Sequence, residues 1–117
     1  MSEPALSDEQ RSVDTRLARE AVSCLPKNWG SARVNITRDP DQAARDRFRV
    51  SIEPKNGETG VAFATDELLS VARELFMLHD RRHTDLVQAV YDFNRVQNKW
   101  KFTAEFVYRN ATDSQKI

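Results

Sequence analysis

The 117-residue sequence has few of the residues that build disulfides, metal sites and phosphate-binding loops. A single cysteine, Cys24, excludes an intramolecular disulfide and a cysteine-rich zinc site. Only three glycines occur, and none lies in a Walker or dinucleotide-binding pattern. The G-x-S-x-G and H-E-x-x-H motifs are also missing. The sequence therefore lacks the motifs of most common catalytic mechanisms, and we expect neither a cofactor nor a bound metal.

Net charge and hydropathy exclude further classes of protein. Eighteen basic residues balance eighteen acidic ones, which argues against a dedicated nucleic-acid binder or a polybasic membrane module. A helix needs about 18 consecutive apolar residues to span a bilayer, and the sequence has no such run. The N-terminal MSEPALSDEQ lacks the basic-then-apolar order of a secretion signal. We expect a cytoplasmic protein with one domain over residues 7–110, between tails at 1–6 and 111–117.

The N-terminal third of the chain predicts one helix. Ser7 followed by Gln10 matches a capping box, in which each side chain satisfies a free backbone N–H. Apolar residues then recur at a spacing of four, at Val13, Leu17 and Ala21. Pro26 cannot continue the helix, and Asn28-Trp29-Gly30 is typical of a turn.

The apolar period then falls to two, which predicts strands. Alternation over residues 32–36 and 48–52 indicates two strands, joined by a loop at 38–46. Asn56-Gly57 favours a type I′ hairpin, because both central residues of that turn need positive φ. Val61 and Phe63 are then expected to form the returning strand of an antiparallel meander.

Three further elements follow. A second apolar helix is expected from Thr65 or Asp66 to about His79. Residues 86–93 fit either a helix or a strand, and their β-branched and aromatic content favours the strand. Residues 100–108 alternate, with Val107 as the one exception, so their aromatic side chains are expected in the core. The order α-β-β-β-α-β-β predicts an α+β domain, with a five-stranded antiparallel sheet and two helices packed on one face.

His79 and His83 are the only histidines and are separated by four residues. On a helix this spacing brings both rings to one side, and Asp80 or Asp85 are the only nearby candidates for a further metal ligand. Arg81 and Arg82 lie between the histidines and would repel a divalent cation. A solvated turn is therefore the favoured interpretation of this segment.

Acidic residues are concentrated in the middle of the chain. Between Glu53 and Glu74 there are five acids against two bases. Glu53, Glu58, Asp66 and Glu67 are the members that we expect to form an acidic surface. The plainer interpretation, a helix-dipole arrangement beside a solvated hairpin, is the more common one. The alternative is a surface complementary to a basic protein.

The order of elements and several landmarks resemble a known family. These are Leu25-Pro26 followed by Trp29, the strands at 32–36 and 48–52, Leu68-Leu69 with Arg73-Glu74-Leu75-Phe76, and the closing run at 101–108. From about Arg19 to Tyr108 the chain resembles the YezG-like immunity proteins, which are bacterial antitoxins encoded beside polymorphic toxins. Where that family tends to carry Trp-Thr before the fourth strand, this chain has His83-Thr84.

The resemblance implies a non-enzymatic inhibitor of the kind used in contact-dependent growth inhibition. Such a protein binds a cognate toxin domain, commonly a nuclease, and blocks its active site or substrate groove. It implies no direct binding to nucleic acid or membrane, and it leaves the oligomeric state open.

The acidic group Glu53, Glu58, Asp66 and Glu67 is the first candidate for the toxin-binding surface. The second candidates are the loop residues Asp39, Asp41 and Asp46 and the corner residues Asp80 and Asp85, because loops vary without harming a core. Two alternatives remain open at this point. One is a small hydrolase that uses His79, His83 and Asp80, and the other is an adaptor or chaperone for a secreted effector.

Overall fold

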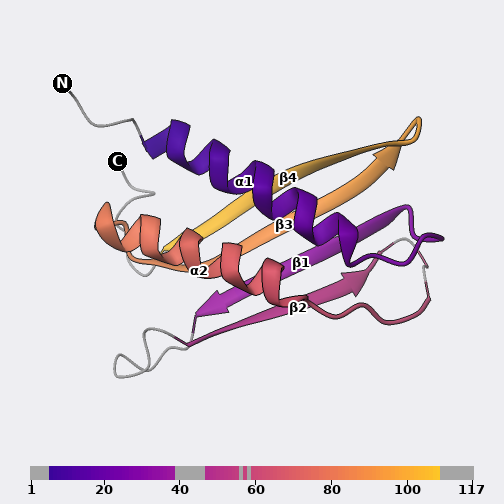
Figure 1. The fold of residues 1–117 in the computed structure, drawn as a ribbon, viewed down its shortest axis with the longest axis horizontal. Helices are drawn as coiled ribbons and strands as arrows, with labels where there is room; N and C mark the ends of the chain where they lie inside the picture. The colour runs from indigo at the N-terminus through magenta and orange to yellow at the C-terminus, as the bar shows by residue number, and fades with distance from the viewer. Residues whose placement is uncertain (1–5, 39–46, 56, 58, 109–117) are drawn as a thin grey trace.

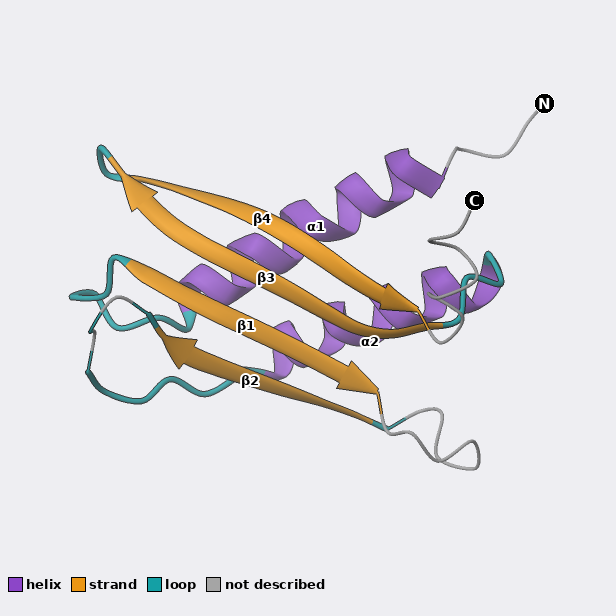
Figure 2. Cartoon of the chain, turned by 180° about the vertical axis from the view of Figure 1, so that it is seen from behind, coloured by secondary structure: helices purple, strands orange, loops and turns teal. Residues whose placement is uncertain are grey.

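A computed structural model describes residues 6–38, 47–55, 57 and 59–108 of the chain. Its elements follow the order α1 (Leu6–Ser23), β1 (Ser31–Arg38), β2 (Phe48–Pro54), α2 (Asp66–Arg81), β3 (Leu86–Val96) and β4 (Lys99–Tyr108). Both helices lie on the same face of the sheet, and no described helix covers the opposite face (Figures 1 and 2). The expected α+β architecture, with two helices on one face of an antiparallel sheet, is confirmed.

The described sheet has four strands in the order β2-β1-β3-β4, and every neighbouring pair is antiparallel. The central strands β1 and β3 place Val34 opposite Tyr91 and Ala32 opposite Phe93. All four side chains are fully buried, Val34, Tyr91 and Phe93 in the core with the helices and Ala32 against Trp29. The core therefore lies between the central strands and the inner faces of α1 and α2.

The strand expected at Val61 and Phe63 is wrong. The segment makes a single bridge to β2, between Ala62 and Ile52, so the order is α-β-β-α-β-β and the sheet has four strands instead of five. The inward residue is Ala62, which is 9% exposed, whereas Val61 and Phe63 are 68% and 79% exposed. Residues 61–63 do alternate between the two sides, but Ala62 faces the protein and the two larger apolar side chains face solvent.

Trp29 explains why the chain does not continue along β2. Gly57 has the positive φ of 82° expected near a tight turn. Beyond it, the buried indole of Trp29 donates its N–H to the carbonyl oxygen of Thr59 at 2.8 Å. Gly60, at a φ of 117°, lies against the same indole and places Ala62 in a small cluster with Trp29 and Ala32. The segment after Gly57 therefore packs on Trp29 and does not form a ladder of hydrogen bonds with β2.

Both helices are where the apolar period predicts them, with different ends. Thr65 caps α2 by accepting the N–H of Leu68, and the helix continues to Arg81, two residues beyond the expected end. Helix α1 begins at Leu6, before the expected cap. The side chain of Gln10 contacts Asp14 and His79. The side chain of Ser7, the other half of the predicted capping box, is not among those that the structure describes.

The ambiguous segment is a strand, β3, as its composition favours. A bulge between Leu86 and Gln88 changes the parity at the start of the strand, so Leu86 is buried in place of Val87, which regular alternation from Ala89 would turn inward. The aromatic residues of β4 also lie on the helix side. They are only partly covered, because β4 is an edge strand, and Phe102 remains 36% exposed.

Leu75 tests the location of the core, because it is fully buried on the inner face of α2. We expect Leu75→Ala to lower the free energy of unfolding by about 2–5 kcal/mol, from lost burial and the cavity left behind. Met77→Ala on the same helix is the control, because Met77 is 52% exposed and its loss should cost well under that. Urea denaturation measures both. Equal losses would contradict the assigned orientation of α2.

Candidate functional site

The structure divides the expected acidic surface. Asp66 and Glu67 lie together, exposed, in the first turn of α2. Glu53 follows the inward-facing Ile52 on β2 and therefore projects from the opposite face of the sheet, across from Arg33. Glu58 lies outside the described residues. Of the four carboxylates, only Asp66 and Glu67 are shown to share one surface.

The second group of candidates is also divided. Asp39, Asp41 and Asp46 lie outside the described residues. Asp80 accepts two hydrogen bonds from the guanidinium of Arg38, at 3.0 and 3.2 Å. Asp85 is partly buried and has a positive φ of 58°. Asp80 therefore has a structural partner within the fold.

An exposed apolar segment lies directly before Asp66 and Glu67. Val61 and Phe63 project into solvent on either side of Ala62, whose burial holds the backbone between them. Phe63 is the most exposed large apolar side chain of the described residues. Two exposed apolar side chains thus precede two exposed carboxylates by a few residues along the chain, and we call Val61, Phe63, Asp66 and Glu67 the apolar-acidic surface. The alternation that predicts a strand at Val61 and Phe63 does not show that this pair faces solvent.

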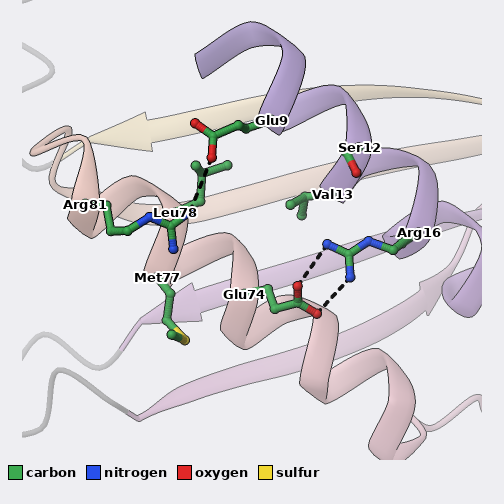
Figure 3. A pocket seen from close by; sticks show the side chains of 8 residues that line it. All are labelled: Glu9, Ser12, Val13, Arg16, Glu74, Met77, Leu78 and Arg81. Atoms are coloured by element: carbon green, nitrogen blue, oxygen red, sulfur yellow. Dashed lines mark hydrogen bonds and ion pairs between the residues drawn. The ribbon is translucent and has the colours of Figure 1, made fainter. Parts of the chain in front are cut away.

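A groove between the two helices is a second feature (Figure 3). Its volume is about 280 Å³, and its apolar part is formed by Val13, Leu78 and Met77. Ion pairs connect α1 and α2 at two places along it, Arg16 with Glu74 at 2.9 Å and Glu9 with Arg81 at 3.3 Å. Glu9 also accepts a hydrogen bond from Arg82, which lowers the pKa of its carboxyl group. The charges of the groove are thus paired with one another.

His79 belongs to a partly buried network of polar side chains between the helices and the sheet. Its Nδ1 lies 2.6 Å from the hydroxyl of Thr84, and its Nε2 lies 2.5 Å from the side-chain oxygen of Gln10. Gln10 in turn donates to Asp14, which also accepts the hydroxyl of Tyr91 at 2.6 Å. An amide oxygen can only accept, so Nε2 carries the proton and Nδ1 accepts from Thr84. These hydrogen bonds connect α1, α2 and β3.

The two histidines do not share a site. His79 is 1% exposed and lies against the rings of Phe106 and Tyr108, whereas His83 is exposed and follows the end of α2 with a positive φ of 58°. The expectation of a solvated turn is therefore wrong for His79. Among the described residues, no three His, Cys, Asp or Glu side chains are grouped so that they could hold a metal ion. With both ring nitrogens occupied and its ring enclosed, His79 holds the elements together.

The chain has no match to a protein-family model, and no curated protein matches it. In the part of the chain that the structure describes, no helix is both long enough and apolar enough to cross a membrane. The features that bear on function are therefore those of the described surface. They define a small α+β domain with a polar open sheet face and an apolar-acidic surface at the start of α2.

Burial is the largest influence on the pKa of His79, and it lowers that pKa below the 6.5 of a free imidazole. The carboxylates of Asp14 and Asp80 act in the opposite direction, and Arg38 adds to the lowering. Because the unfolded chain then binds the proton more readily, the stabilising contribution is fully present above about pH 6.5. It is lost as the pH falls from there toward the lowered pKa of the folded state.

We expect the free energy of unfolding in urea to fall between about pH 7 and pH 5.5, with a slope from this group of at most about 1.4 kcal/mol per pH unit. His79→Gln should remove that fall even though the variant is less stable at neutral pH. His83→Gln is the matched control, because His83 is exposed, and it should keep the fall. An unchanged pH profile in His79→Gln would contradict the role given to the buried imidazole.

Proposed function

We propose that the chain is a bacterial immunity protein that acts in the cytoplasm by binding the toxin domain encoded beside it. The toxin is of the nuclease class, and the chain blocks its active site or substrate groove without performing chemistry itself. The sequence resemblance to YezG-like immunity proteins supports the class of function. The exposure of Phe63, at 79%, is the structural observation that carries the choice of surface.

An exposed phenylalanine on a fixed backbone is suited to anchor a partner. Aromatic side chains dominate binding energy at protein interfaces because they remove a large apolar area from water. Ala62 is buried between Val61 and Phe63, and the Trp29 indole holds Thr59. Little backbone freedom is therefore lost when the segment is covered, which favours tight binding.

The carboxylates beside the anchor suit a basic partner. Asp66 and Glu67 are exposed and have no ion pair with any described residue. A nuclease attracts the phosphates of its substrate with lysine and arginine, so an inhibitor with carboxylates in this position is attracted by the same field. Charge of this kind mainly raises the association rate, while the apolar anchors slow dissociation.

The anchor is tested by co-expression with the neighbouring toxin domain. The unaltered chain should restore growth, and Phe63→Ser should weaken binding about 30-fold or more, the effect of losing a residue worth about 2 kcal/mol or more at an interface. Met77→Ser is the matched control, because it removes another exposed apolar side chain, from α2, and should leave rescue intact. Equal binding by the two variants would rule out the apolar-acidic surface. Binding without rescue would indicate an adaptor instead of an inhibitor.

The carboxylates are tested by the kinetics of association. Reversing both charges, in Asp66→Lys with Glu67→Lys, should slow association with the toxin domain about tenfold at low salt and should change dissociation little. The control reverses Asp8 and Glu105, which are also exposed, with Asp8 likewise in the first turn of a helix. Stopped-flow or surface-binding measurements give the rates. Association rates that fall equally in both variants would assign the effect to net charge alone.

A further inference from the structure

Strand β4 presents a long edge of the described sheet. It lies at one end of the order β2-β1-β3-β4, and among the described strands it pairs with β3 alone. From Lys99 to Val107 it contains no proline and follows β3 without a shift of register. The opposite edge strand, β2, is shorter, ends at Pro54 and is bridged by Ala62. Because a long and regular edge is a template for pairing with another strand, β4 is the edge suited to a partner.

The backbone groups that point outward along this edge belong to alternate residues of β4. Arg95 of β3 donates its N–H to the carbonyl oxygen of Gly30 at 2.8 Å, on the side of β3 that faces away from β4. Its partner on β4 is Trp100, so these two form a pair without hydrogen bonds between them. Such pairs alternate with hydrogen-bonded ones along an antiparallel ladder. Trp100 and every second residue as far as Phe106 therefore turn their N–H and C=O groups away from β3.

The charges on the open face of β4 are complementary to themselves. Lys101 and Glu105 are exposed, lie at equal spacing on either side of Thr103, and make no ion pair with any described residue. When a second copy of β4 runs antiparallel with Thr103 opposite Thr103, Lys101 of each copy faces Glu105 of the other. Opposite charges across two strands stabilise their pairing, whereas registers centred on Lys101 or on Glu105 would oppose like charges.

The side chains of β4 on the helix side fit the same register. Phe102 is 36% exposed, and the end of β4 that is joined to β3 extends past both helices (Figure 2). With Thr103 at the centre, Phe102 lies opposite the small side chain of Ala104 in the second copy, and Trp100 lies opposite Phe106. Large side chains thus meet either a small one or another ring, and apolar area that β4 leaves in water becomes covered.

We propose that two copies of this chain pair through β4 and join their four-stranded sheets into one continuous sheet. The occupant of the edge is a second copy, because the charges of β4 match those of β4 itself in a register that also matches its aromatic side chains. A two-fold axis at Thr103 places the helices of both copies on the same face of the joined sheet. The outward N–H and C=O groups of β4 then bond to the second copy. The apolar-acidic surface uses other residues, so a single chain should still bind the toxin domain.

Sedimentation equilibrium of the full chain tests the dimer by exchanging its charges. At about 100 μM the unaltered chain should have twice the mass of one copy, because a Kd of about 10 μM leaves most chains paired. Lys101→Glu should raise the Kd about tenfold or more, since it replaces attraction by repulsion at two symmetric places. Adding Glu105→Lys to this variant restores opposite charges across the interface and should return the Kd to within about threefold of the original.

Arg49→Glu is the matched control. Arg49 is exposed on the same open face, but on β2 at the other edge of the sheet, and the substitution changes the net charge as Lys101→Glu does. It should leave the Kd unchanged, and circular dichroism verifies that every variant folds. A single copy at about 100 μM, an equal rise of the Kd in the control, or a folded double variant that stays as weak as Lys101→Glu would overturn the proposal.

Hydrogen exchange followed by NMR tests the backbone pairing. The amides of Phe102 and Ala104 should exchange more slowly as the concentration of the chain rises, because only the second copy supplies their acceptors. The amide of Thr103 is directed at β3 and should be protected at every concentration. Protection of Phe102 and Ala104 that appears only when the toxin domain is added would assign this edge to the toxin and overturn the dimer.

Discussion

The covering of one sheet face by two helices is the constraint on which the other features of this fold depend. Buried side chains of the central strands, such as Val34 and Tyr91, need an apolar surface opposite them, and the inner stripes of α1 and α2 provide it. The cover is complete over the central strands β1 and β3, whose inward side chains are buried, and partial over the edge strands β2 and β4. Edge strand β4 consequently keeps half-buried aromatics, and the open face of the sheet stays polar.

Two polar devices fix the helices over the sheet. The chain from Thr84 through His79, Gln10 and Asp14 to Tyr91 satisfies its buried members in turn, so the side chains that form it are held in one arrangement. On the outer surface, the Arg16–Glu74 and Glu9–Arg81 pairs join α1 to α2 where the side chains are exposed. Exposed pairs of this kind contribute little free energy, and the buried chain matters more for specifying the arrangement.

Trp29 connects the fold to the surface that we propose for toxin binding. The indole of Trp29 is fully buried and donates its N–H to the carbonyl oxygen of Thr59. The segment after β2 therefore lies against the indole and leaves the sheet. Ala62, small enough to enter this cluster, then directs Val61 and Phe63 outward. The same local packing that ends the strand pairing thereby exposes the apolar anchor beside the first turn of α2.

Local patterning was sufficient to predict both helices, the strands β1 to β4 and the layering of helices on one sheet face, because periods of 3.6 and 2 depend on neighbours along the chain. Strict alternation at residues 61–63 could not show which side faces inward, since Trp29 decides that from a distance. The sequence could not show that Glu53 and Asp66 lie on different surfaces, because that depends on which residues of β2 face the helices. The burial of His79 and the pairing of Arg38 with Asp80 arise only when β1, α2 and their partners pack, so they belong to the tertiary structure alone.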